Sequence, residues 1–204
     1  MNISETEIIS KVKTAFLSPD YFSRGAEESA LNLLGRMILT DEGGKLSGGI
    51  IVETEAYGGF DDPGSHAYSG ITPRNSVMLG PPGTVYVYLC YGASNMLNIV
   101  TGRKGRPEAV LLRALQPAAG IEAMTARRGG CREQLLAKGP GRLAQALGIT
   151  RAMNGLPMGS CGIMISRSRF LRQPVSRTGR IGIKKGEGLP LRFIFDGNKY
   201  VSKG

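Results

Sequence analysis

The chain has 204 residues, of which 41% are hydrophobic and 21% charged, and its 26 Lys and Arg against 16 Asp and Glu give a formal net charge of +10. This length suits one well-packed domain of ordinary globular composition, and no apolar run is long enough to span a bilayer. The three cysteines are far apart and form no CxxC pair, which argues against a disulfide framework or a zinc site and favours a cytoplasmic location, nucleoid-associated in a bacterium.

The charge is unevenly distributed along the chain. Residues 1–102 carry 6 Lys and Arg against 11 Asp and Glu, a net of −5, whereas residues 103–204 carry 20 against 5, a net of +15. A half this basic should attract a polyanion, and nucleic acid is the common one. From charge alone, a solvated basic face or a nonspecific association with RNA stays open as an alternative.

The first half of the chain predicts two helices, a hairpin and a long loop. Residues 5–16 and 26–36 have helical patterning, and a β-hairpin follows in which residues 37–39 and 49–55 form the strands. Residues 58–83 are rich in Gly, Pro, Asp and Ser and are interpreted as a loop. Loops of this length in a compact domain are usually functional or disordered.

The second half alternates between short strands and short helices. The predicted strands cover residues 83–92, 95–101, 109–115, 163–166 and 191–195, and the predicted helices cover residues 121–127, 132–137 and 141–147. Short turns rather than crossover helices join the strands, which favours antiparallel pairing. We therefore expect a mixed α/β (α+β) fold with a mainly antiparallel sheet, forming a single domain over residues 1–204.

One segment gathers acid and imidazole in an otherwise basic protein. Residues 53–66, ETEAYGGFDDPGSH, hold four carboxylates and the only histidine of the chain. On a strand Glu53 and Glu55 share one face, and a carboxylate at a strand end beside a loop is well placed to act as a general base. Two solvent-facing strand residues are the alternative. His66 has no second histidine beside it, so no metal site is expected.

Tyrosines are concentrated around this segment. Four of the seven, Tyr57, Tyr86, Tyr88 and Tyr91, lie in it or in the following β-prone run. Alternation places Tyr86 and Tyr88 on one face, with Tyr91 on the other side or at the hairpin end. Such rings can stack on nucleobases, each stack contributing roughly 1–3 kcal/mol, although an ordinary aromatic core is an equally good interpretation of any one of them.

A glycine-rich stretch in the basic half is a candidate phosphate contact. KGPGRLAQAL lacks the spacing of a P-loop and is better interpreted as the start of a helix. Its backbone amides, with Lys138 or Arg142, could hold a DNA phosphate, and a simple turn and cap is the alternative.

Taken together, nine blocks of the sequence resemble one known family. In chain order they are VETEAYGG, SHAYSG, TPRN, PGTVYVYLCYG, MLNI, VLLRALQP, KGPGRLAQALGI, GRIGI and PLRF. They resemble the 3-methyladenine DNA glycosylases of the alkyladenine DNA glycosylase type over most of residues 30–203. Two segments, Thr101–Pro107 and Lys184–Gly188, depart from the family pattern and leave the preferred lesion open.

The resemblance implies a repair enzyme that acts on duplex DNA carrying a damaged purine. The fold would be a curved sheet with surrounding helices and a protruding β-hairpin, working as a monomer without a cofactor or a membrane. The enzyme would flip out 3-methyladenine or 7-methylguanine, with hypoxanthine and ethenoadenine as further candidates, and hydrolyse the N-glycosidic bond. It would leave an abasic site without cleaving the strand, because no obvious buried amine is present for a Schiff base.

The resemblance also assigns roles to individual positions. Glu55 falls on the general base that activates the attacking water, while Arg113 and the backbone carbonyl of Ile181 match the groups that help hold this water. The substrate-binding positions are Tyr57 on one face of the flipped base, His66 and Tyr88 on the other, and Asn98 crowding the 2-amino group of normal guanine. Tyr91 matches the residue that wedges into the duplex and fills the gap.

Three carboxylates of the acidic segment receive no assignment. Glu53, Asp61 and Asp62 are expected to be structural or solvent-facing. Two other function classes stay open at this point: a non-catalytic nucleic-acid-binding domain similar to the C-terminal domain of formyltransferases, and a hydrolase of free nucleosides. The presence of Glu55, Arg113 and His66 together argues against the first, and a salt-dependent affinity for DNA would argue against the second.

Overall fold

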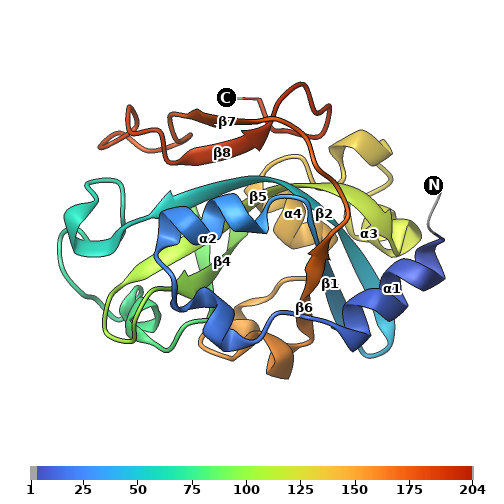
Figure 1. Cartoon of the computed structure of the whole chain (residues 1–204), viewed down its shortest axis with the longest axis horizontal. Coiled ribbons are helices and arrows are strands. Elements are labelled where there is room, and N and C mark those ends of the chain that lie inside the picture. The colour runs from blue at the N-terminus through green and yellow to red at the C-terminus, as the bar shows by residue number, and fades with distance from the viewer. Residues whose placement is uncertain (1–3, 204) are drawn as a thin grey trace.

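The computed structural model describes residues 4–203, which form a mixed α and β domain (Figure 1). Its α-helices are α1 (Glu5–Thr14), α2 (Ala26–Leu33), α3 (Ile121–Arg127) and α4 (Pro140–Ala146). Its strands are β1 (Arg36–Glu42), β2 (Lys45–Tyr57), β3 (Val85–Cys90), β4 (Ser94–Thr101), β5 (Glu108–Ala119), β6 (Ile163–Arg169), β7 (Val175–Thr178) and β8 (Arg192–Phe195). The α+β class predicted from the sequence is confirmed.

The strands form one curved sheet in the order β3-β4-β5-β2-β1-β6, with every pair antiparallel. Strand β2 organises the sheet because β5 pairs along one of its edges while β1 and then β8 share the other. β7 pairs with β8, and this C-terminal ribbon lies along the top of Figure 1. Short turns join most consecutive strands, which is why the antiparallel prediction holds.

The alternation of side chains along β2 decides what lies on each side of the site. Val52 and Ala56 pack into the main core on the side of α2, and between them the Thr54 hydroxyl donates to the Ala30 carbonyl of α2 at 3.0 Å. Glu53, Glu55 and Tyr57 therefore project from the opposite face. A second core cluster, around Val12 of α1 with Met37 and Leu39, closes the far end of the sheet.

Two local expectations were wrong and one strand was missed, each for a physical reason. The helix predicted over 26–36 ends at Leu33, because Gly35 has a φ of +80° and Arg36 already begins β1. A Cβ at Gly35 would lie 2.0 Å from the Leu171 carbonyl oxygen, so only glycine fits this turn. The helix predicted over 132–137 is only a 3₁₀ turn at Glu133–Leu135. Strand β7 was not predicted, since VSRT is short and polar and borders the sheet only through β8.

The long loop over 58–83 is ordered by internal hydrogen bonds. The Asn75 side chain donates to the carbonyls of His66 and Gly70 at 2.8 and 3.1 Å and accepts from the amide of Thr72 at 2.7 Å. A buried Met78 anchors the loop's last turn to Tyr86 and Val100. The loop is thus a fixed wall, and the side chains it carries have defined positions.

Candidate active site

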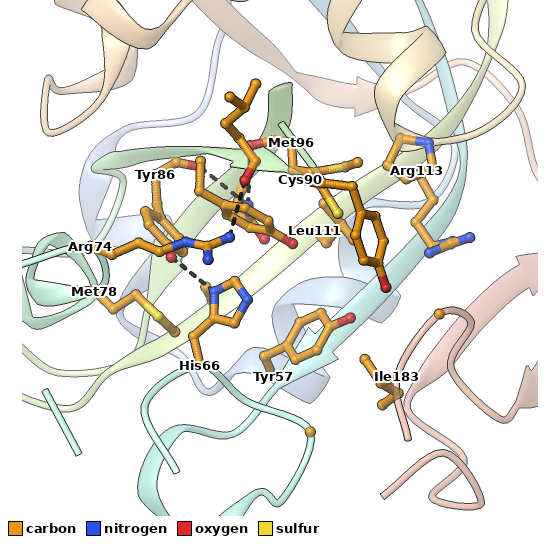
Figure 2. Close-up of a pocket in the computed structure, with 18 of the residues that line it drawn as sticks. Tyr57, His66, Arg74, Met78, Tyr86, Cys90, Met96, Leu111, Arg113 and Ile183 are labelled. Atoms are coloured by element: carbon orange, nitrogen blue, oxygen red, sulfur yellow. Dashed lines mark hydrogen bonds between the residues drawn. The ribbon is translucent and has the colours of Figure 1, made fainter. Parts of the chain in front are cut away.

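A cavity of about 700 Å³ opens between the β3–β4 hairpin, the loop over 58–83 and the segment that follows β7 (Figure 2). Most of the predicted site residues line it: Tyr57, His66, Tyr88, Tyr91, Asn98, Arg113 and Ile181. They come from β2, the loop over 58–83, the β3–β4 hairpin, β5 and the segment after β7. The structure therefore gathers in one place what the sequence has in separate motifs.

Aromatic side chains form one wall of this cavity. Tyr86 and Tyr88 lie on one face of β3, as alternation predicts, and the His66 ring packs edge-on against Tyr88 with centroids 4.5 Å apart. The His66 Nδ1 and the Tyr86 hydroxyl are hydrogen-bonded at 2.9 Å. Burial, together with the charge of Arg74, lowers the pKa of His66 below its usual value, so the ring is neutral at pH 7.

The wall is fixed further by Asn98 of β4. Its side-chain amide donates to the carbonyls of Tyr86 and Met96 at 3.2 and 3.3 Å, and the residue is 3% exposed. Burial raises the pKa of Tyr86 to about 12, so its hydroxyl is protonated and available to His66. The wall can hold a planar group between rings and offers a few polar atoms to its edge.

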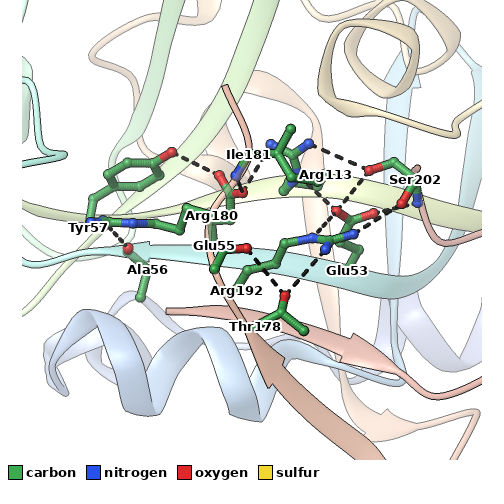
Figure 3. A network of polar contacts seen from close by, with 11 residues as sticks. Glu53, Glu55, Ala56, Tyr57, Arg113, Thr178, Arg180, Ile181, Arg192 and Ser202 are labelled. Atoms are coloured by element: carbon green, nitrogen blue, oxygen red, sulfur yellow. Dashed lines mark hydrogen bonds and ion pairs between the residues drawn. The ribbon is translucent and has the colours of Figure 1, made fainter. Parts of the chain in front are cut away.

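Glu55 is fully buried beside the cavity and is held by donors from three elements (Figure 3). The amide of Ile181 donates to its Oε1 at 2.8 Å, and Arg113 Nη1 lies 3.2 Å from the same oxygen. The Tyr57 hydroxyl donates to Oε2 at 2.8 Å. Burial, and then the Glu55 charge, raise the pKa of Tyr57 well above its ordinary value, so this hydroxyl keeps its proton.

A charged network lies directly behind this carboxylate. Glu53 is also fully buried, and Nε of Arg113 and Nε of Arg192 each donate to its Oε1 at 2.8 Å. Ser202 donates to Glu53 through its amide at 2.7 Å and its hydroxyl at 2.8 Å. Burial alone would raise the pKa of Glu53, but Arg113, the Ser202 amide and Arg192 outweigh it and lower the pKa below its ordinary value. The expectation that Glu53 is structural fits; a solvent-facing position does not.

Arg113 connects the two carboxylates. Its side chain is 6% exposed and contacts Glu53 through Nε and Glu55 through Nη1. Burial opposes its charge, but Glu55 and Glu53 raise its pKa above the ordinary value. A guanidinium shared in this way fixes the positions of the two carboxylates relative to each other.

A second buried ion pair lies on the other side of Tyr57. Both guanidinium nitrogens of Arg180 donate to the Asp62 carboxylate, at 2.5 and 2.6 Å, and Nη1 also donates to the Ala56 carbonyl at 2.9 Å. The guanidinium carbon lies 4.8 Å from the centroid of the Tyr57 ring. Burial alone would raise the pKa of Asp62, but Arg180 and the amides of Gly58 and Gly64 lower it.

The β3–β4 hairpin carries Tyr91 at its tip. Tyr91 is 94% exposed and is the one residue other than glycine in the described part of the chain with a positive φ, of 49°. Tyrosine in this conformation is strained, which is a feature of functional positions more often than of ordinary turns. Tyr91 also lines the cavity, and it lies at the hairpin end, one of the two positions that the alternation allows.

The two predicted phosphate contacts lie at the start of α4, whose Pro140 also lines the cavity. The Lys138 ammonium donates a hydrogen bond to the Lys199 carbonyl at 2.6 Å. Arg142 is exposed, and its guanidinium reaches the Lys138 carbonyl only at 3.5 Å. Arg142 is therefore the freer of these two cations beside Pro140.

Comparison with known proteins identifies the family. A family model described as "Methylpurine-DNA glycosylase (MPG)" matches residues 20–199. The chain belongs to this family. Two curated relatives carry the name "Putative 3-methyladenine DNA glycosylase": one from Rhodopseudomonas palustris (strain HaA2) is 48% identical, covering 89% of this chain and 88% of the relative, and one from Carboxydothermus hydrogenoformans is 43% identical, covering 92% and 98%.

Membership makes the chain a DNA glycosylase of the 3-methyladenine type, an enzyme of DNA repair, and confirms the resemblance stated from its motifs. Within residues 4–203 no three His, Cys, Asp or Glu side chains come together as metal ligands. None of the glycosylase's helices in that same span is long and apolar enough to cross a membrane.

The structure adds two features to the glycosylase's expected site. Ile181 contacts Glu55 through its backbone amide, and the role of its carbonyl toward a water stays a prediction. Sequence reasoning also missed the roles of Glu53, Asp62, Arg180 and Arg192 as a buried charged layer. The signal for Glu53 was its shared face with Glu55; Arg180 and Arg192 gave none, because basic residues are common throughout that half.

Proposed function

We propose that this glycosylase hydrolyses the N-glycosidic bond of damaged purines flipped out of duplex DNA, with Glu55 as the general base. The observation that carries the proposal is the buried Glu55 carboxylate, which contacts Arg113 and the Ile181 amide, two groups from residues that line the aromatic cavity. Oε1 has two donors, whereas Oε2 has Tyr57 alone among the described residues. Oε2 therefore retains a lone pair with which to accept a proton from water.

The chemistry needs little beyond this carboxylate. Oε2 takes a proton from water, the water oxygen attacks C1′ of the deoxyribose, and the bond from C1′ to the purine nitrogen breaks with its electron pair on the base. A purine alkylated at N3 or N7 is positively charged and leaves as a neutral base. The Glu55 charge also stabilises the oxocarbenium-like sugar. No lysine lines the cavity within the described residues, which supports base release without strand cleavage.

The damaged base would occupy the aromatic cavity. Tyr57 would stack on one of its faces, while His66 and Tyr88 close the other and the neutral His66 ring bonds its edge. Substrates would be 3-methyladenine and 7-methylguanine, with hypoxanthine or ethenoadenine also admitted. Asn98, held rigidly by β3, would disfavour the 2-amino group of normal guanine.

The chain would act as one glycosylase domain and as a monomer on duplex DNA. One assay tests the function directly: duplexes carrying a single defined lesion are incubated with the protein, and free base and abasic sites are measured. Release of free damaged base from duplex supports the proposal. Release from nucleosides but not from duplex would contradict it in favour of a nucleoside hydrolase.

Tyr91→Ala should weaken the binding of lesion-containing duplex more than the binding of single strands. The exposed ring at the hairpin tip would fill the gap left by the flipped nucleotide, and such stacking contributes about 1–3 kcal/mol. Fluorescence anisotropy with the two kinds of DNA measures the difference. Tyr91→Phe, which keeps the ring, is the matched control and should bind like the wild type. Equal losses on both DNAs would remove the wedge role.

Binding should weaken steeply with salt, and Arg142→Ala should reduce that dependence. Each phosphate contact adds about 0.9 to the slope of log affinity against log salt, so losing one contact lowers the slope by about that amount on any duplex sequence. Affinities measured across a salt series give the slope. Lys11→Ala, an exposed cation on α1 away from the cavity, should leave it unchanged. An unchanged slope for Arg142→Ala would remove this phosphate contact.

A further inference from the structure

The Tyr57 ring lies between the cavity and a buried cation. Tyr57 lines the cavity, whereas Arg180 does not, and the Arg180 side chain is fully buried. The Arg180 guanidinium carbon nevertheless lies 4.8 Å from the centroid of the same ring (Figure 3). The ring therefore has a guanidinium on its protein side and the substrate space on the other.

A buried cation behind Tyr57 would disfavour the binding of positively charged bases in the cavity. A tyrosine face attracts a cation through its quadrupole, but a bare charge behind the ring would repel a second cation in front of it. The effect persists because the intervening ring and core exclude water and so screen charges poorly. A neutral base would feel no such net repulsion.

Asp62 neutralises the positive charge of Arg180. Its carboxylate accepts hydrogen bonds from Nη1 and Nη2 of Arg180 at 2.5 and 2.6 Å. It also accepts hydrogen bonds from the backbone amides of Gly58 and Gly64 at 3.0 and 2.9 Å. Glu53 and Glu55 offset Arg113 and Arg192 in the same way on the far side of Tyr57. The buried layer behind the cavity then carries three acids and three guanidinium groups.

We propose that Asp62 is a specificity-determining residue, which neutralises Arg180 behind Tyr57 so that the cavity accepts positively charged purines as readily as neutral ones. The inference rests on the proposed function, in which Tyr57 stacks on the flipped base. Asp62 acts through Arg180 and the ring and does not itself touch the base. Asp62 lies in the loop over 58–83, and the same loop carries His66 of the opposite cavity wall.

Asp62→Asn should shift the balance between charged and neutral substrates. The carboxamide keeps the shape and an acceptor for Arg180 but leaves its charge uncompensated. Single-turnover rates are measured on duplexes with one 7-methylguanine, which is cationic, or one neutral purine, hypoxanthine or ethenoadenine. The ratio of the cationic to the neutral rate should fall on the order of tenfold, given an unpaired charge within stacking distance of the ring. Equal losses on both substrates would show a merely structural clamp and overturn the proposal.

Two further variants make the result specific. Asp61→Asn changes the neighbouring carboxylate, which is 86% exposed and whose one ion pair within residues 4–203 is with Arg106, so the ratio should stay unchanged. The double variant Asp62→Asn with Arg180→Gln removes both buried charges and should restore the wild-type ratio within about threefold. A ratio that moves with Asp61→Asn, or that the double variant fails to restore, would overturn the proposal even if Asp62→Asn alone does not fold.

The wild-type rates separate this inference from the function on which it rests. If the wild-type protein releases neither base from duplex DNA, the proposed function fails. If it releases both and the ratio does not respond to Asp62→Asn, only the role of Asp62 fails.

Discussion

Glu55→Gln should abolish the release of damaged purines from duplex DNA while lesion binding is retained. The amide cannot take a proton from water at neutral pH, and loss of a general base typically costs about 10²–10⁴ in rate. Loss of the negative charge beside the sugar adds to this, because the oxocarbenium-like state is no longer stabilised. Single-turnover release of 7-methylguanine, measured with enzyme in excess, gives the rate directly.

Measuring the affinity of Glu55→Gln for lesion-containing duplex distinguishes loss of catalysis from misfolding. Glutamine keeps the size of Glu55, but its NH₂ group must face one of the donors from Tyr57, Arg113 or Ile181, so a modest loss of stability is expected. Lesion-duplex affinity within a few-fold of the wild type shows an intact cavity. Glu42→Gln, at an exposed carboxylate paired with Arg127, is the matched control and should excise normally. Full excision by Glu55→Gln would exclude Glu55 as the base.

Glu53→Gln should lower the free energy of unfolding by about 3–5 kcal/mol, because it leaves two buried guanidinium groups, of Arg113 and Arg192, without their shared counter-ion. Urea titration at neutral pH measures the change. Glu27→Gln is the control: Glu27 pairs with Arg177 at the surface with 51% of its side chain exposed, so its loss should cost no more than about 1 kcal/mol. Equal effects of the two substitutions would contradict the importance assigned to burial.

The same carboxylate makes the stability depend on pH in a defined direction. The pKa of Glu53 is lower in the folded protein than its ordinary value of 4.5. Its contribution is therefore complete above about pH 4.5 and is lost as the pH falls through the folded value. The free energies of unfolding of the wild type and Glu53→Gln should converge as the pH is lowered from 7 to 3. A constant difference over that range would contradict the assignment.

Much of the fold could be predicted from local patterns. Alternation along β3 placed Tyr86 and Tyr88 together, and short connections predicted antiparallel pairing, because both depend on neighbours in the sequence. Strand β7 could not be predicted in this way. Its four residues are polar and form a strand only because β8 is beside them. The end of helix α2 could not be predicted either, because it depends on the close approach of the Leu171 backbone to Gly35.

The candidate site was likewise predictable where it depends on a local motif, and not where it depends on distant partners. The motif around residues 53–66 indicated Glu55, Tyr57 and His66, and the structure brings all three to the cavity or its edge. Which carboxylates are buried could not be read from that motif. Glu53 and Asp62 are buried through ion pairs with arginines that lie 60 to 139 residues away in the sequence. Nothing in the local sequence distinguishes these arginines from the other Lys and Arg of the basic half.

The dependence of β2 on distant partners has a consequence for how the protein is made. Strand β2 ends at Tyr57, but Glu55 receives an amide from Ile181 and Glu53 receives donors from Arg192 and Ser202. A ribosome synthesises these partners roughly 125–150 residues after the strand they complete. A nascent chain can therefore form most of its sheet, and bring Arg113 to both acids, while Glu53 and Glu55 still lack these later donors. The proposed active site is therefore completed only after the residues up to Ser202 have been synthesised.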